Sequence, residues 1–187
     1  MSPLRFPDLR RPKGAARWGG PLRRLLALAA VACLAAAACG GSGRPEFSHT
    51  FQSADALAAE VLDALARKDA PHLQALALGE HEFRKWVWPR LPVSRPGVNV
   101  SFDYFWKDFA FKSRASLAST LHEFGGERFV LQRVEFLGET TDYGTFSVSR
   151  DAQLTVTDAL GRQRTICVFG SVVQTGGRHK LFSYVVD

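Results

Sequence analysis

Apolar residues recur at two different spacings along the chain, helical in its first half and strand-like in its second. Residues 54–67 repeat apolar side chains at helical spacing, which predicts an amphipathic helix. Its apolar stripe consists of Leu57, Val61, Leu62 and Leu65. Ser53 is suited to cap this helix, and Asp55 suits the positive end of its dipole.

More helical segments follow. Asp69 is a suitable N-cap for a second helix, which is expected to run to about Leu78. Residues 80–88 also have a helical pattern, which we expect to stop at Pro89. Residues 89–98 contain three prolines and are expected to form a loop.

After an aromatic and then helical stretch at 101–124, the spacing changes to that of strands. The strand candidates are 128–137, 143–150, 153–158, 163–174 and 178–186, and Gly-containing turn signals separate them. Helices followed by an antiparallel meander predict the α+β class, with N-terminal helices packed on a curved antiparallel sheet.

The first 38 residues have the features of a signal peptide. The uncharged, apolar stretch 25–38 follows a basic segment. Its 14 residues fit the roughly 7–15 of a signal h-region and fall short of the ~20 that a membrane-spanning helix needs. We therefore expect residues 1–38 to be removed after export.

The sequence Ala36-Ala37-Ala38-Cys39 resembles the lipobox of bacterial lipoproteins, although that family usually has Leu at the position of Ala36. The resemblance implies cleavage before Cys39, a lipid on its thiol and a membrane anchor. The site would be the periplasmic face of an outer membrane, or the outer face of the plasma membrane in a cell without one. An ordinary signal peptide cut near Ala38 is the alternative.

Residues 39–50 are rich in Gly, Ser and Pro, so we expect a flexible tether before a single domain at 51–187. The leader holds seven of the 24 basic and one of the 18 acidic residues, which leaves 17 of each in the mature protein. A neutral domain lacks the basic footprint of a nucleic-acid-binding protein. We therefore expect no nucleic-acid partner.

The segment LARKDAPHLQALAL, in which Asp69 links two short helices, and the later strands resemble the NTF2-like (cystatin-like cone) superfamily. The resemblance covers about Phe51 to Asp187. It implies a cone that holds an acid or His in the isomerase- and cyclase-type enzymes and binds ligands or partners in other members. No position of this chain maps onto such an acid or His.

Motifs for catalysis, metals or cofactors do not emerge from the sequence. The five histidines lack zinc-ligand spacing and HExxH, and neither GxSxG nor a P-loop occurs. Cys167 lies among apolar residues, so a buried, unreactive thiol is expected. We predict no catalytic residue, no metal and no cofactor.

Eight aromatic residues lie within the 26 residues 86–111. They could line an apolar pocket or fill the core, and packing alone explains their density. The weak candidates for a pocket are Trp86, Trp88, Tyr104 and Trp106. Asp103 and Asp108 would be acid candidates only if such a pocket exists.

Three functions remain open. The first is a non-catalytic lipoprotein of the cell envelope that binds a small apolar ligand or a partner protein. The second is an isomerase- or cyclase-type enzyme that acts on a small apolar substrate. The third is a structural accessory domain. An open cone lined by aromatic residues and one buried acid or His would favour the enzyme. An open cone without ionisable groups would favour binding, and a filled cone would favour the accessory role. The oligomeric state is left open.

Overall fold

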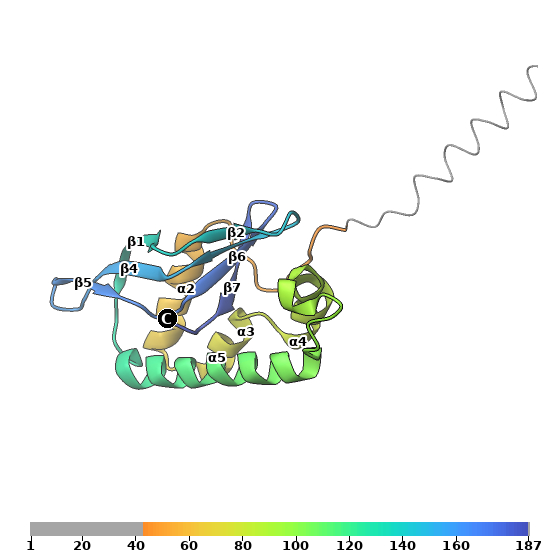
Figure 1. Ribbon diagram of the computed structural model, residues 1–187. Helices are drawn as coiled ribbons and strands as arrows, with labels where there is room; N and C mark the ends of the chain where they lie inside the picture. The colour runs from red at the N-terminus through yellow and green to blue at the C-terminus, as the bar shows by residue number, and fades with distance from the viewer. Residues whose placement is uncertain (1–42, 187) are drawn as a thin grey trace, which may run out of the picture. The chain divides into compact units, whose positions relative to one another are not determined.

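The helices precede the strands in the chain, as the sequence predicts (Figure 1). The computed structural model describes residues 43–186, so the leader, the predicted cleavage site and Cys39 lie outside the described residues. The helices are α2 (Ala54–Ala66), α3 (Ala70–Leu76), α4 (Glu80–Glu82) and α5 (Phe102–Phe124). Three irregular turns lie between α4 and α5: the π-helical η1 (Phe83–Val87) and the 3₁₀ turns η2 (Trp88–Arg90) and η3 (Pro92–Ser94).

Local capping explains where α2 and α3 begin. The Ser53 hydroxyl accepts a hydrogen bond from the Ala56 N–H at 3.0 Å, and the Asp69 carboxylate accepts one from the His72 N–H at 3.0 Å. Both predicted caps are therefore confirmed. Helix α3 ends two residues earlier than expected, because the Leu78 N–H donates to the carbonyl of Leu181 in the sheet.

The proline-rich region is more helical than expected. Pro89 does not stop the helical segment at Trp88 but lies inside η2, and η3 interrupts the predicted loop 89–98. Proline lacks an N–H, so it is tolerated in the first turn of a helix, where that N–H would have no helical partner. The aromatic stretch after residue 101 is also helical, since α5 runs without a break from its N-cap Ser101.

The strands form two antiparallel sheets, which confirms the α+β class. One sheet has the order β1-β4-β5 and the other β2-β3-β6-β7. The strands are β1 (Val130–Phe136), β2 (Thr140–Asp142), β3 (Ser147–Arg150), β4 (Ala152–Thr157), β5 (Gln163–Ile166), β6 (Ser171–Thr175) and β7 (Arg178–Ser183).

Two strand predictions need correction. The expected strand 163–174 is divided into β5 and β6, which belong to different sheets. Gly170 lies in the break between β5 and β6. A Cβ at this position would collide with the carbonyl of Val185, so only glycine allows the two backbone segments to approach so closely. The turn expected over 138–141 is shorter, because Thr140 and Thr141 belong to β2, and strand β3 begins only at Ser147.

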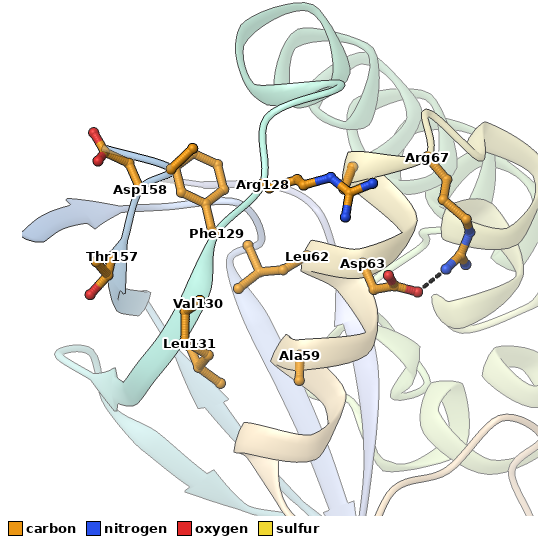
Figure 2. Close-up of a pocket in the computed structure, with 12 residues that line it drawn as sticks. Ala59, Leu62, Asp63, Arg67, Arg128, Phe129, Val130, Leu131, Thr157 and Asp158 are labelled. Atoms are coloured by element: carbon orange, nitrogen blue, oxygen red, sulfur yellow. Dashed lines mark ion pairs between the residues drawn. The ribbon is translucent and has the colours of Figure 1, made fainter. Parts of the chain in front are cut away.

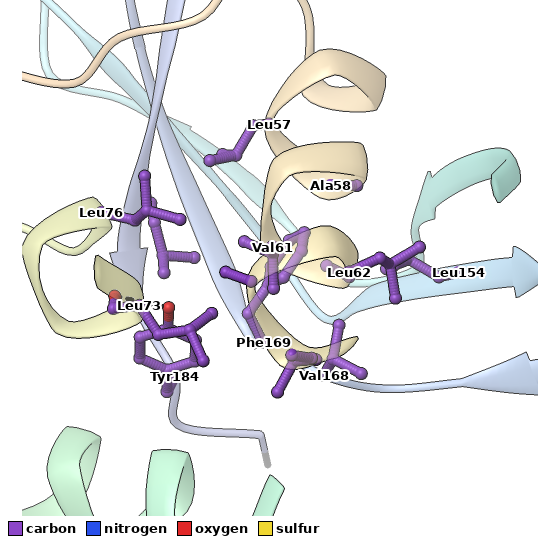
Figure 3. Close-up of a cluster of buried hydrophobic side chains, with 14 of the residues drawn as sticks. Leu57, Ala58, Val61, Leu62, Leu73, Leu76, Leu154, Val168, Phe169 and Tyr184 are labelled. Atoms are coloured by element: carbon purple, nitrogen blue, oxygen red, sulfur yellow. Dashed lines mark hydrogen bonds between the residues drawn. The ribbon is translucent and has the colours of Figure 1, made fainter. Parts of the chain in front are cut away.

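Two groups of buried side chains hold the helices to the sheets. The aliphatic cluster joins α2 and α3 to the strands, and Figure 3 shows Leu57 and Val61 of α2 on the side that faces Leu73 and Leu76 of α3. Its buried members include Leu57, Val61, Leu65, Leu73, Leu76, Leu117, Leu154, Val156, Phe169, Leu181 and Tyr184. The aromatic cluster is separate and comprises Leu78, Phe83, Val87, Phe102, Phe146, Val148 and Val173, with Trp88, Phe105, Trp106, Phe109 and Phe182 packed against them.

The folded domain begins before residue 51, which corrects the predicted length of the tether. Phe47 packs against the aromatic cluster. The carboxylate of Glu82 accepts hydrogen bonds from the N–H and the hydroxyl of Ser48, at 2.6 and 2.9 Å. The fully buried ammonium of Lys180 donates to the Ser48 carbonyl at 2.9 Å and lies 3.5 Å from Glu82. Polar groups far apart in sequence thus fix this segment, which composition alone does not indicate.

Candidate functional site

The aromatic residues of α5 pack on Phe83 of η1. The ring of Phe83 is fully buried, and its centroid lies 4.9 Å from that of Phe109 and 5.4 Å from that of Trp106. Aromatic pairs prefer such tilted arrangements at 4.5–7 Å. These contacts explain why the irregular turns after α4 are held against α5.

The four aromatic residues proposed for a pocket do not share one environment. Trp106 packs on Phe83, and Trp88 meets Phe102 edge-on at 5.5 Å. The indole of Trp86 lies beside the backbone of Gly43, and the ammonium of Lys85 is 4.5 Å from its ring centroid. Tyr104 is 73% exposed on α5. Trp88 and Trp106 therefore belong to the aromatic cluster, Trp86 is half-buried outside it, and Tyr104 borders an open hollow with Phe111.

Asp103 and Asp108 are exposed and carry ion pairs on the surface. Asp103 lies 2.8 Å from the guanidinium of Arg84, and Asp108 lies 2.8 Å from the ammonium of Lys112. The hydrogen bonds from Arg84 to Glu80 and Asp103 raise the pKa of its guanidinium. Both carboxylates are exposed and ion-paired; Asp108 borders an open hollow of about 380 Å³ beside Tyr104 and Phe111.

The histidines are dispersed. His49, His81 and His122 are exposed, whereas His72 and His179 are half-buried. The Nε2 atom of His72 lies 2.7 Å from a carboxylate oxygen of Glu60. In residues 43–186, no three His, Cys, Asp or Glu side chains gather closely enough to hold a metal ion.

Cys167 is exposed, which corrects the expectation of a buried thiol. Side chains alternate across an extended chain, so the burial of Ile166 and Val168 places Cys167 on the opposite, solvent-facing side. Its apolar neighbours in sequence concealed this alternation.

The candidate site is a groove of about 460 Å³ between α2 and the start of β1 (Figure 2). We call it the α2–β1 groove. Three segments line it: one face of α2, the residues that lead into β1, and the end of β4. The lining residues are Ala59, Leu62, Asp63, Ala66, Arg67, Arg128, Phe129, Val130, Leu131, Thr157, Asp158 and Ala159.

The floor of the groove is apolar, and its rim is charged. Leu62 is buried beneath it, whereas Val130 is 63% exposed beside it. Arg67 forms an ion pair with Asp63, drawn as a dashed line in Figure 2. Arg128 reaches from the β1 side toward α2, and among the described residues it has no ion-pair partner.

Asp158 is the acid at the end of the groove, and its charge is already satisfied. Its carboxylate accepts hydrogen bonds from the N–H groups of Leu160 and Arg162 and from the Arg162 side chain, each at 2.9 Å. The bond from the Arg162 backbone is the main cause that lowers the pKa of Asp158. The groove therefore offers one uncompensated cation, Arg128, above an apolar floor.

Sequence reasoning missed this groove because its residues come from three distant segments. The signal available was a pair of apolar residues, Phe129 and Val130, next to Arg128 at the entrance to a strand. That pattern is common in strands and predicts no site without the position of α2.

Comparisons with protein-family models, with curated proteins and with solved structures gave no match for this chain. None of the described helices is both long and apolar enough to cross a bilayer. The function must therefore be inferred from the lipobox-like segment and from the surface of residues 43–186.

Proposed function

We propose that this chain is a lipoprotein of the bacterial cell envelope, anchored through lipid on Cys39, whose domain binds a small apolar anion without catalysis. The observation that carries the ligand class is the α2–β1 groove, with its apolar floor and the unpaired Arg128 at its rim. The lipobox-like sequence before Cys39 supports the anchor.

The groove matches a ligand with an apolar body and one acidic group. Binding sites for small molecules have volumes of about 300–1,000 Å³, apolar walls and a few polar groups that orient the ligand. The groove has about 460 Å³ and an uncompensated guanidinium. Arginine pairs with a carboxylate through two parallel hydrogen bonds, so a fatty-acid-like anion is the simplest occupant.

Binding is favoured over catalysis by the chemistry of the lining. The groove includes neither His nor Cys, and its carboxylates on Asp63 and Asp158 are held in ion pairs. General acid–base catalysis needs a group that can exchange a proton near neutral pH. An isomerase- or cyclase-type enzyme, the function of some proteins in the superfamily that this chain resembles, is therefore the weaker candidate.

A structural accessory role is the second candidate. The space between α2, α3 and the strands is filled by the aliphatic cluster, in which Leu57, Leu73 and Leu154 are fully buried, and a filled interior favours this role. Binding is placed first because of the α2–β1 groove, which opens at the surface. Under this alternative the surface would recognise a partner protein, and the groove would be a shallow part of that surface.

A fluorescent fatty-acid analogue tests the groove. We expect saturable binding by the parent, a loss of at least about tenfold in affinity for Arg128→Glu, and a loss for Ala59→Trp, which fills the groove. Arg95→Glu, an equal charge change at an exposed position outside the groove, is the control and should bind as the parent does. Equal binding by all four proteins, or none by the parent, would contradict the proposed ligand.

Membrane fractionation tests the anchor separately. We expect Cys39→Ser to block processing and release the protein, because acyl chains contribute about 0.8 kcal/mol per buried CH₂ and more than one chain gives stable anchoring. Unchanged membrane association together with an unchanged precursor mass would exclude lipidation at Cys39.

A further inference from the structure

The folded domain begins very close to the proposed lipid anchor. Gly43 is the first described residue, four positions after Cys39. Four residues span at most about 14 Å even when fully extended. If Cys39 is lipidated, the surface around Gly43 is thus held within reach of the lipid headgroups.

That surface includes the irregular turns before α5. The backbone of Gly43 lies beside the indole of Trp86, and Lys85 lies over the same ring at 4.5 Å. Figure 1 shows the entering segment, residues 43–51, drawn in orange next to the yellow-green turns, at the opposite end of the sheets from the β4–β5 hairpin. Anchoring therefore brings this end, and not the hairpin end, to the membrane.

The turns carry an excess of positive charge. Residues 83–102 contain four basic and no acidic side chains, in a mature chain with 17 of each. Arg84 is paired with Glu80 and Asp103. The other three, Lys85, Arg90 and Arg95, are exposed and form no ion pair within the described residues.

Apolar side chains accompany these charges. Trp86 is half-buried, so part of its indole is available to solvent, and Val98 is 46% exposed. Tryptophan is enriched at membrane interfaces, and Lys and Arg near a bilayer are attracted to anionic headgroups. We use the name entry patch for the exposed cations and the solvent-accessible apolar side chains of this segment, namely Lys85, Trp86, Arg90, Arg95 and Val98.

We infer that the entry patch docks on an anionic lipid surface and fixes the orientation of the domain on the membrane. This inference rests on the proposed anchor at Cys39. The anchor supplies proximity, the three unpaired cations supply complementarity to anionic headgroups, and Trp86 and Val98 supply interfacial apolar contact. Residues 83–102 combine a charge excess with exposed apolar groups, whereas the charges of Arg44 and Glu46, next to the anchor, cancel.

The test uses the mature lipidated protein, in which lipid blocks the thiol of Cys39. Cys167→Ser removes the exposed thiol of Cys167, so that the dye reacts only with the introduced cysteine. An environment-sensitive dye is attached after Val98→Cys in the patch or after Leu160→Cys in the β4–β5 hairpin, where Leu160 is 75% exposed. Each protein is reconstituted in protein-free vesicles of phosphatidylcholine alone or mixed with phosphatidylglycerol. Flotation measures anchoring, and dye emission together with quenching by doxyl-labelled lipid measures docking.

We expect the dye at position 98, and not at position 160, to shift to shorter wavelength and to be quenched in the vesicles that contain phosphatidylglycerol. The charge reversal Lys85→Glu with Arg90→Glu and Arg95→Glu should abolish the shift and leave flotation unchanged. The matched reversal of Lys68, Lys107 and Arg114 to Glu should leave both unchanged, because these three cations are also exposed and form no ion pair within the described residues.

Each other result overturns a defined part. Flotation without any shift, or a shift that the patch reversal does not reduce, refutes docking and leaves the anchor intact. The measurement is repeated with vesicles that contain native membrane proteins. A shift of the dye emission that appears only in these vesicles assigns the patch to a protein partner and refutes docking on lipid. Failure of the parent to float refutes the anchor and the docking that depends on it.

Discussion

The aliphatic and aromatic clusters stabilise the same domain in different ways. The aliphatic cluster is built from helical stripes and alternating strand positions, and its side chains are almost all fully buried. The aromatic cluster joins the irregular turns and the first turns of α5 to Val148 of β3, Val173 of β6 and Phe182 of β7, and most of the rings packed around its buried members remain half-buried. Regular periodicity thus produces a closed core, whereas large rings allow short, irregular segments to be held with fewer residues.

Truncation of one side chain in each cluster gives the largest expected effect. Phe83→Ala should cost about 3–5 kcal/mol of unfolding free energy and Leu154→Ala about 2–5 kcal/mol, because both side chains are fully buried. Chemical denaturation followed by both tryptophan fluorescence and circular dichroism measures the loss. Coincident transitions are expected if the clusters unfold together. Separate transitions for Phe83→Ala would show that the aromatic cluster is an independent unit.

The apolar stripe of α2 and the caps of α2 and α3 were predicted correctly, and for a physical reason. The positions Leu57, Val61 and Leu65 repeat at helical spacing, and Ser53 and Asp69 supply local caps whose geometry depends on a few neighbouring residues. Such signals are contained within one segment. They fix the start of each helix and the face it buries, and hence the α+β class.

The features that were missed depend on contacts between distant segments. The end of α3 is set by Leu181, 103 residues after Leu78 and in the last strand. The start of the domain is set by Glu82 and Lys180, and the α2–β1 groove exists only where three segments meet. Neither composition nor periodicity reports on such contacts, so the tether was drawn too long and the groove was not foreseen.

The polar contacts of Ser48 with Glu82 and Lys180 are expected to have the next largest effect on stability. Glu82→Ala should cost about 3 kcal/mol, since it leaves the fully buried ammonium of Lys180 without its carboxylate. Burial lowers the pKa of Lys180, which is the electrostatic cost that Glu82 offsets.

Glu80→Ala is the matched control for this cluster. Glu80 lies two residues before Glu82, and its replacement removes only an exposed ion pair with Arg84. This change should cost at most about 1 kcal/mol. Equal losses for the two variants, measured by urea unfolding, would mean that the buried cluster is not a special constraint on residues 43–50.

A smaller effect separates the two tryptophans that the sequence treated alike. Trp106→Ala should cost about 3 kcal/mol, because the ring packs on Phe83, Phe102 and Phe109. Trp86→Ala should cost less than half as much, since its indole contacts mainly Gly43 and Lys85. Denaturation midpoints compare the two variants. A larger loss of stability for Trp86→Ala would mean that Trp86, and not Trp106, packs in the core of this region.

The smallest expected effect is a dependence of stability on pH at the edge where the entering segment meets the sheet. His179 and Phe51 exchange backbone hydrogen bonds at 2.8 Å in both directions, and the Nδ1 atom of His179 is buried without a partner among the described residues. Burial is the main cause that lowers the pKa of His179 below its ordinary value of 6.5, and the nearby charge of Arg178 acts in the same direction. A lowered pKa means that the unfolded chain takes up this proton more readily than the folded one. The free energy of unfolding should therefore fall as the pH drops below about 6.5, until the pH passes the pKa of the folded state.

We expect His179→Gln to flatten this fall in stability between about pH 7 and 5, a range in which ordinary carboxylates remain ionised. The control is His122→Gln, at an exposed position near the end of α5, which should leave the fall unchanged. Urea midpoints measured across that pH range test this prediction. An equal pH dependence of the midpoint in the parent and in His179→Gln would mean that the imidazole of His179 has the same pKa in the folded and the unfolded chain.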